Sequence, residues 1–220
     1  PELAKYATSK GMRAVISTNG TLIDRDMAKT LKGVGLSYVG VSLDGGEDVH
    51  DGFRGVKGSY RRALEGLEYC KEEGIKAGLR FTINKRNAAE IPKIFDILRD
   101  RDIPRVCFYH LVYSGRGTEL VKEDLNHAET RAAVDLIMDK TRELFDQGHP
   151  KEVLTVDNHA DGPYVWMRML KEDPKRAEEV FQLLQYNEGN SSGRGIGCIS
   201  WDGKVHADQF WRNHTFGNVL

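Results

Sequence analysis

The sequence predicts an α/β fold, a partial (β/α) barrel of the TIM type with parallel strands. Three observations support this prediction. Short β-branched apolar segments alternate with longer segments of helical periodicity. The apolar segments contain few polar positions, which is typical of parallel strands that are buried on both faces. Each of them runs into polar residues where it ends, as barrel strands do when their carboxyl ends open onto a site.

Five strands are expected, one at each apolar segment, at residues 13–18, 38–43, 76–83, 104–111 and 152–156. Helices are expected between them, because apolar residues recur there at i, i+3, i+4 and i+7. N-capping residues mark their starts: Asp24, Ser59, Asn126 with Glu129 as a capping box, and Asp173 before Pro174. The charged, glycine-containing segment 50–55 is expected to be a loop.

Composition limits the function. The chain has 220 residues, a net charge of −1 and 40% hydrophobic residues. This balance is typical of a soluble globular protein and argues against general binding of nucleic acid or of acidic membranes. No apolar run is long enough for a membrane span, and no signal peptide opens the chain. The three cysteines are widely spaced and suggest no disulfide framework, which fits a reducing, cytoplasmic compartment.

Two domains are expected. Residues 1–186 would form the barrel domain, and residues 187–220 would comprise a linker rich in Gly, Ser and Asn and the start of a smaller module. In that module Asp202-Gly203 separates two short β-like runs and predicts a hairpin. The chain begins without Met and ends abruptly, so we expect it to be a fragment of a longer protein.

The polar residues that follow the strands form the candidate site. They are Thr18-Asn19, Ser42 and Asp44, Asn84, Tyr109-His110, and Asp157 to His159. One such cluster alone would suggest a surface turn or a helix cap. Five clusters at the carboxyl ends of parallel strands favour a site, because those ends meet at one edge of the sheet.

The ordered motifs resemble those of radical S-adenosylmethionine (SAM) enzymes. The resemblance rests on Ser17-Thr18-Asn19-Gly20, on Val41-Ser42-Leu43-Asp44-Gly45 and on the segment 50–60, which reads HDGFRGVKGSY. Segments 197–205 and 216–219 resemble the start of a SPASM/Twitch-type extension, which holds auxiliary clusters. The C-x3-C-x2-C loop for the catalytic 4Fe–4S cluster and the Gly-Gly-Glu-Pro segment are absent, and the resemblance places both upstream of Pro1.

A narrower resemblance is to the tetrapyrrole-modifying branch, which includes the 12,18-didecarboxysiroheme deacetylases and the heme d1 biosynthesis enzymes. Segments 108–117, 155–162 and 198–211 carry it. It implies removal of side chains from an iron tetrapyrrole derived from siroheme, through a 5′-deoxyadenosyl radical formed from SAM. It further implies an auxiliary 4Fe–4S cluster and an electron donor such as ferredoxin or flavodoxin.

The resemblance also implies roles for individual residues. SAM would be bound by Thr18, Asn19, Ser42, Asp44 and, through its carboxylate, Arg54. The tetrapyrrole would be bound by His110, Arg116, His159, Arg194 and His206, with Tyr109 and His110 as candidate catalytic residues. Cys198 follows the Gly195-Ile196-Gly197 segment and is the candidate cluster ligand, whereas Cys70 and Cys107 occupy apolar periodic positions and are expected in the core.

Other functions remain open from the sequence. A SPASM-type enzyme that modifies peptides would share the motifs. A cluster-free TIM-barrel lyase would want a reactive lysine at a strand end, and Lys85 lies in what resembles a surface turn. A tetrapyrrole carrier would use the histidines alone. Buried histidines are more often structural than functional, so His110 and His206 could equally be core residues.

Overall fold

The computed structural model describes residues 1–220, with the exception of the Arg116 side chain. The chain divides into two compact units. The first comprises residues 1–111 and 120–156, and the second comprises residues 112–119 and 157–220. Each unit is considered by itself. The division after Val156 differs from the expected boundary at residues 186/187, and a separate module at residues 187–220 stays a prediction.

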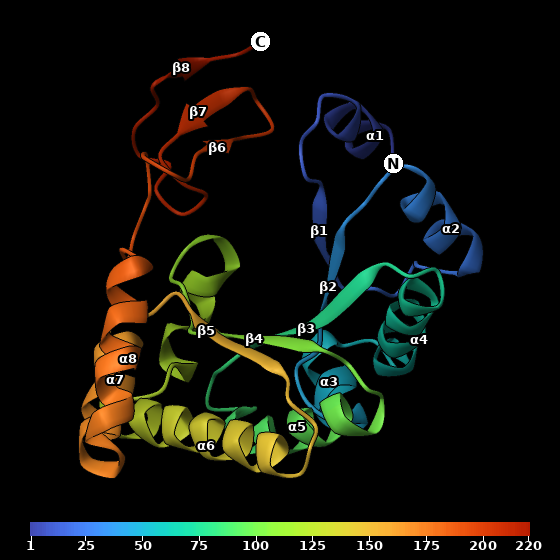
Figure 1. The fold of residues 1–220 in the computed structure, drawn as a ribbon. Coiled ribbons are helices and arrows are strands. Elements are labelled where there is room, and N and C mark those ends of the chain that lie inside the picture. The colour runs from blue at the N-terminus through green and yellow to red at the C-terminus, as the bar shows by residue number, and fades with distance from the viewer. The chain divides into compact units, whose positions relative to one another are not determined.

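The first unit is built on a five-stranded parallel sheet in the order β1-β2-β3-β4-β5 (Figure 1). Its strands are β1 Val15–Thr18, β2 Tyr38–Ser42, β3 Lys76–Thr82, β4 Arg105–Tyr109 and β5 Glu152–Val156. Consecutive strands are neighbours, so every connection crosses over in the same direction, as in a (β/α) barrel. The structure confirms the predicted fold class.

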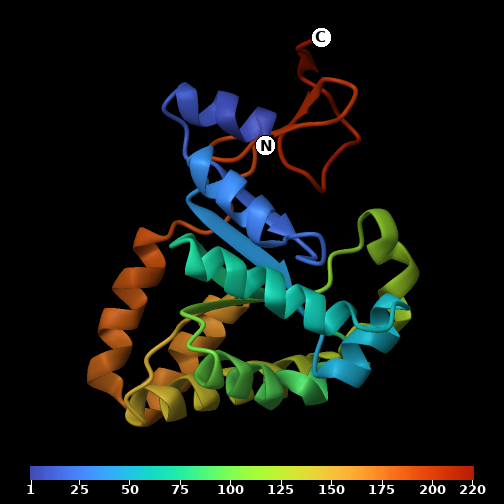
Figure 2. The same cartoon turned by 90° about the vertical axis from the view of Figure 1, so that its right-hand side faces the viewer.

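Helices cover the outer side of this curved sheet (Figures 1 and 2). They are α1 Glu2–Ser9, α2 Arg25–Gly33, α3 Glu47–Arg54, α4 Ser59–Glu72, the 3-10 turn η1 Ala88–Glu90, α5 Ile91–Asp100 and α6 His127–Asp146. The alternate strand residues that face them are fully buried: Val39, Val41, Leu79, Phe81, Val106 and Phe108. Phe108 stacks on Phe95 of α5 and meets Phe81 edge to face, so aromatic packing fixes the helix against the sheet.

The opposite side of the sheet, here called the inner face, is polar. It presents Tyr38, Gly40 and Ser42 of β2, Gly78 and Arg80 of β3, and Arg105, Cys107 and Tyr109 of β4. Apart from the two glycines and Cys107, these residues are only half-buried. The expectation of strands buried on both faces is therefore wrong for this side, because long polar side chains lie there in place of an apolar layer.

Two local expectations between β2 and α4 are corrected. Residues 50–55 belong mostly to helix α3, which begins after Gly46 and ends at Gly55 in the left-handed conformation (φ 66°). Ser59 is the first residue of α4 and not its cap. By contrast, the caps at Asp24 and Asp173 and the capping box of Asn126 with Glu129 are present.

The second unit contains the turn η2 Gly115–Glu123 in part, the helices α7 Asp161–Glu172 and α8 Pro174–Tyr186, and a small antiparallel sheet. The two helices pack together, with Trp166 against Phe181. The sheet consists of β6 Cys198–Ile199, β7 Lys204–His206 and β8 Gly217–Asn218. The predicted hairpin is present, with Gly203 at a φ of 78° in its turn. In the parts of the chain that the structure describes, no helix is long and apolar enough to cross a membrane.

Candidate functional site at the carboxyl edge of the sheet

The carboxyl ends of the five strands lie along one edge of the sheet, because all strands are parallel and in consecutive order. Ser42 pairs in register with Arg80 of β3, and the His110 amide donates to the Val156 carbonyl at 3.0 Å. Ser42 and His110 therefore lie at the same edge, as the fold prediction requires. The roles of the individual side chains stay predictions.

The turn after β1 holds two of the residues expected near SAM. Thr18 lies on the helix-covered face of the sheet, and its Oγ1 accepts a hydrogen bond from the Gly20 amide at 3.1 Å. Asn19 is exposed, and its Oδ1 accepts from the amide of Thr21 at 3.2 Å. Both side chains shape the turn, which leaves a contact of either with SAM as a prediction.

A buried charged cluster follows β2. Asp44 is 3% exposed, and Arg54 of α3 donates to its two carboxylate oxygens, from Nε at 2.5 Å and from Nη2 at 3.1 Å. His50, also buried, accepts the Asp44 amide proton on Nδ1 at 3.0 Å. The same Nδ1 lies 3.2 Å from the carboxylate, but an atom that accepts a proton cannot donate one there. We therefore assign the partner of the Asp44 charge to Arg54.

The arrangement has a consequence for Arg54. Its guanidinium already forms a bidentate pair with a carboxylate of this chain, and a third of its side chain is exposed (33%). The expected pairing of Arg54 with the SAM carboxylate would use its remaining N–H groups. Asp44 holds Arg54 at the end of β2, and both stay candidates for the SAM side of the site.

Asp51 of α3 caps the following helix. Its carboxylate accepts hydrogen bonds from the Gly58 amide at 2.5 Å, the Tyr60 amide at 2.8 Å and the Ser59 hydroxyl at 2.8 Å. These bonds satisfy amides that the first turn of α4 leaves without partners. The Tyr60 amide first, and then the Gly58 amide and the Ser59 hydroxyl, lower the pKa of Asp51 from 3.8 to about 2.

This cap predicts an acid-dependent loss of stability. The folded pKa of Asp51 lies below its unfolded value, so its contribution is complete above about pH 4 and disappears as the pH falls towards 2. We expect Asp51→Asn to lower the melting temperature at pH 6 and to approach the wild type near pH 2. The measurement is thermal unfolding between pH 2 and 6. Asp48→Asn, on an exposed position of the same helix, is the control, and a pH-independent difference for Asp51→Asn would contradict the assignment.

Asn84 follows β3 and is buried, but it serves its own turn. Its Nδ2 donates to the Thr82 carbonyl at 3.2 Å and its Oδ1 accepts from the Arg86 amide at 2.9 Å. Nearby, Glu90 of η1 accepts the Gly46 amide at 2.7 Å and so fixes the turn that follows Asp44. Asn84 therefore stabilises the backbone of the turn that follows β3.

Tyr109 ends β4, His110 follows it, and both are half-buried. The ring of Tyr109 lies under the guanidinium of Arg80, whose Cζ is 4.2 Å from the ring centre. Cation and ring therefore form one unit on the inner face. The expected catalytic role of Tyr109 and His110 stays a prediction, and their position at the strand edge is compatible with it.

The other expected substrate residues belong to the second unit. His159 and Arg194 are exposed, and Arg194 pairs with Glu188. His206 is 4% exposed; its Nδ1 contacts the His214 carbonyl at 2.7 Å and its Nε2 lies 3.3 Å from the Ser200 hydroxyl. These contacts favour a structural role for His206. The side chain of Arg116 lies outside the described residues.

The three cysteines lie in different surroundings. Cys70 is fully buried, and burial raises the pKa of its thiol to about 11, while Cys107 is 6% exposed. Cys70 belongs to the apolar core, as expected, whereas Cys107 is buried on the polar inner face, opposite Arg80. Cys198 is half-buried on β6, opposite His206. Among the described residues no group of three His, Cys, Asp or Glu side chains is arranged to hold a metal ion. The three cysteines of this chain are fewer than the four thiolates that usually hold a 4Fe–4S cluster.

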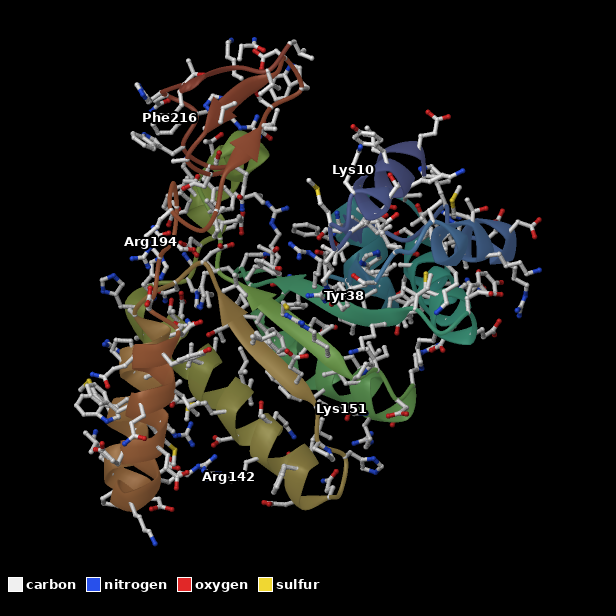
Figure 3. All side chains as sticks on the ribbon, turned by 45° about the horizontal axis from the view of Figure 1, so that its top comes forward. Lys10, Tyr38, Arg142, Lys151, Arg194 and Phe216 are labelled. Carbon is white, nitrogen blue, oxygen red and sulfur yellow. The ribbon has the colours of Figure 1, made fainter. Side chains whose placement is uncertain are left out.

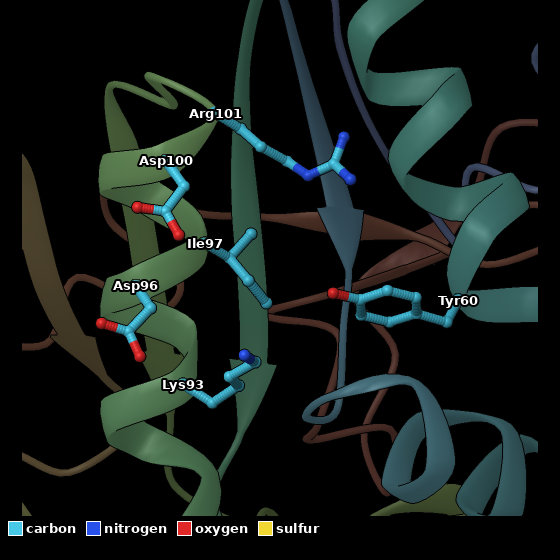
Figure 4. A pocket seen from close by; sticks show the side chains of 6 residues that line it. All are labelled: Tyr60, Lys93, Asp96, Ile97, Asp100 and Arg101. Carbon is cyan, nitrogen blue, oxygen red and sulfur yellow. The ribbon is translucent and has the colours of Figure 1, made fainter.

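A pocket of about 430 Å³ lies between α4 and α5 (Figure 4). Its lining consists of Tyr60, Lys93, Asp96, Ile97, Asp100 and Arg101. These residues come from the helices of the outer side, and none of the residues expected to bind SAM lines it. The pocket is therefore separate from the edge of the sheet.

The sequence reasoning gave no role to His50 and Asp51. Both lie in the segment expected to be a loop, and the signal for a helix there is the pair of glycines, Gly46 and Gly55, that bounds α3. On a helix, His50 and Arg54 are four residues apart and share a face, which would have predicted a joint contact with Asp44.

Comparison with known proteins identifies the superfamily. Residues 1–98 match the model of the radical SAM superfamily. The chain is 68% identical over 219 residues to the Fe-coproporphyrin III synthase of Methanosarcina barkeri, and 39% identical over 221 residues to the pre-heme d1 synthase of Dinoroseobacter shibae. These alignments cover 100% and 99% of this chain and 55% and 54% of the relatives. The chain thus spans about half the length of these curated relatives.

Solved structures agree on the fold. SuiB of Streptococcus suis, in a crystal structure with S-adenosylmethionine, superposes with a TM-score of 0.72 at 17% identity, covering 99% of this chain and 47% of that one. The protein anSMEcpe with bound AdoMet and the peptide Kp18Cys gives a TM-score of 0.67 at 19% identity, covering 99% and 57%. These likenesses show a shared fold. The match of residues 1–98 to the superfamily model shows that the chain belongs to the radical SAM superfamily.

Proposed function

We propose that the whole protein is a radical SAM enzyme that acts on the side chains of an iron tetrapyrrole derived from siroheme. The observation that carries this proposal is the 68% identity, along the entire chain, to a protein named Fe-coproporphyrin III synthase. The 39% identity to a protein named pre-heme d1 synthase supports a tetrapyrrole rather than a peptide as the substrate. The named product, an iron coproporphyrin, fits an enzyme that removes side chains from 12,18-didecarboxysiroheme.

The residues of the carboxyl edge fit SAM. SAM carries ribose hydroxyls, an amino group and a carboxylate, and the edge offers Ser42, the Asp44–Arg54 pair and the exposed Asn19. SAM, cleaved reductively at a 4Fe–4S cluster, supplies a radical that abstracts hydrogen from the substrate. We propose that cluster ligands lie outside residues 1–220 of the whole protein, and that the chain described here orients SAM and the tetrapyrrole. A ferredoxin or flavodoxin would supply electrons.

The test is an anaerobic assay of the full-length protein with a reconstituted cluster, SAM, dithionite and 12,18-didecarboxysiroheme. Mass spectrometry is expected to show 5′-deoxyadenosine together with a tetrapyrrole that has lost its acetate side chains. A heme d1 type of reaction would give a different product mass. SAM cleavage without any change in the tetrapyrrole, or a requirement for a peptide, would refute the proposal.

An auxiliary 4Fe–4S cluster with Cys198 as a ligand is a further part of the proposal. The glycine-rich segment before Cys198 lets the backbone turn, and the β6–β7 hairpin holds the residue at an edge. We expect Cys198→Ala in the full-length protein to reduce iron content by about one cluster after anaerobic reconstitution, because cluster irons are held by cysteine thiolates. Iron analysis is the measurement and the core variant Cys70→Ala is the control. Equal iron content in the two variants would mean that Cys198 is not a ligand.

A further inference from the structure

The inner face of the sheet carries an arginine that this chain leaves without an anionic partner. Arg80 of β3 is half-buried, and it forms no ion pair with any residue that the structure describes. Its neighbour Arg105 differs, because its Nη1 lies 3.4 Å from the Glu152 carboxylate. A partly desolvated guanidinium without a counter-ion is unusual, since burial of a charge is costly unless the charge is paired. Arg80 is therefore a candidate for binding an external anion.

Two glycines leave space for large side chains on the inner face, Gly40 for Arg80 and Gly78 for Tyr38. A Cβ at Gly40 of β2 would lie 2.8 Å from Cδ of Arg80, so the aliphatic part of the arginine lies directly on the β2 backbone. Gly78 plays the same part for Tyr38, whose hydroxyl would be 2.4 Å from a Cβ at that position. Gly40 and Gly78 are register partners on neighbouring strands. Figure 3 shows the side chain of Tyr38 on this part of the sheet. The sequence thus keeps both positions open for large polar side chains.

The orientation of Arg80 leaves its donors available. Its Cζ lies over the ring of Tyr109, 4.2 Å from the ring centre, and its N–H groups form no hydrogen bond with the residues that the structure describes. The N–H groups point outward in the plane of a guanidinium, and this edge is the part that binds a carboxylate in a bidentate manner. The contact with the tyrosine ring therefore leaves the N–H groups of Arg80 available to a ligand.

We propose that Arg80 binds a carboxylate side chain of the tetrapyrrole substrate, with Tyr109 and Gly40 as the residues that position it. The proposal rests on the proposed function, which supplies a substrate with several carboxylates. Charge complementarity selects this ligand, because the inner face presents two arginines and two tyrosines on three adjacent strands and no acid on those strands. Ser42 is the register partner of Arg80, so the carboxylate would lie next to the residues expected to bind SAM.

The test uses the full-length protein and two probes, iron coproporphyrin III and its tetramethyl ester, which lacks carboxylate charge. Tetrapyrrole affinity is measured by titration of the Soret absorption, and SAM affinity is measured by equilibrium dialysis on the same preparations. Arg80→Gln is expected to weaken binding of the free acid by about tenfold to a hundredfold. Binding of the ester and of SAM should stay at the wild-type level.

Three further variants sharpen the test. Arg80→Lys keeps the positive charge but not the planar guanidinium. Gly40→Ala keeps Arg80 but adds a methyl group where its side chain lies. Both variants are expected to weaken free-acid binding less than Arg80→Gln. Arg61→Gln, at an exposed arginine paired with Glu47, is the matched control and should bind like the wild type.

The alternatives give separate results. Free-acid binding by Arg80→Gln at the wild-type level would overturn the proposal, as would an equal loss for acid and ester. A loss of SAM affinity with unchanged tetrapyrrole affinity would assign the carboxylate to SAM and also overturn it. A wild-type protein that binds neither probe would refute the proposed function itself.

Discussion

Gly66→Ala is expected to destabilise the protein, although alanine is the better helix former. Gly66 lies inside α4, where a Cβ would be 2.3 Å from the carbonyl oxygen of Gly20 and 3.1 Å from Cβ of Ile23. The first of these atoms belongs to the backbone of the turn after β1, so the helix or the turn must move. We expect the free energy of unfolding to fall by about 1–3 kcal/mol, the usual cost of overpacking.

Gly52→Ala provides the matched control, because it makes the same substitution in helix α3 at a position with no atom within 4 Å. Here the gain in helix propensity is unopposed, and we expect stability to rise by about 0.5–1 kcal/mol. Denaturant unfolding of both variants is the measurement. Changes of the same sign would show that the close approach between α4 and the turn carries no strain.

The Gly66 variant also tests the site. Gly20 has a φ of 74° and closes the turn that carries Thr18 and Asn19. If this turn contacts SAM, its displacement by Gly66→Ala should weaken SAM binding while Gly52→Ala leaves it unchanged. Equal SAM affinity in the two variants would show that the turn does not contact SAM.

The parallel sheet could be predicted from the sequence because its signals are local. Apolar β-branched runs, the glycines and asparagines that end them, and the capping box of Asn126 with Glu129 each act within a few residues. The five strands consequently lie at the expected places, and none of their ends differs from the expectation by more than two residues. Their order then follows from the preference for right-handed crossovers between neighbouring strands.

The parts that sequence reasoning missed depend on contacts between elements. Helix α3 is short and polar, and its stability comes from Gly46 and Gly55 at its ends and from His50 and Arg54 on Asp44. The polar inner face is visible in β3, where the buried Ala77, Leu79 and Phe81 alternate with Lys76, Arg80 and Thr82, and the expectation of strands buried on both faces overlooks this alternation. The surroundings of Arg80 could not be predicted, since only the register of three strands brings it to Tyr109 and Gly40.

For the pair of Asp44 and Arg54 we expect unequal losses of stability. Arg54→Ala leaves the buried Asp44 carboxylate without its partner, which costs about 3–5 kcal/mol when one member of a buried pair is removed. Asp44→Ala leaves an arginine whose side chain is 33% exposed and can be rehydrated, so we expect a smaller loss, about 2 kcal/mol. The double variant should be more stable than the sum of the two losses predicts, by about 1–3 kcal/mol.

The exposed pair of Arg61 with Glu47 is the control for this double-mutant cycle. Its members are 67% and 45% exposed, and the coupling is expected to stay below about 1 kcal/mol. SAM affinity is then measured for all variants at a temperature at which each is folded. If both residues contact SAM, each single variant should lose affinity by about 1.5–3 kcal/mol, the value of a hydrogen bond to a charged group. Unchanged SAM affinity in both single variants would mean that Asp44 and Arg54 have a structural role only, in which their bidentate pair joins α3 to the end of β2.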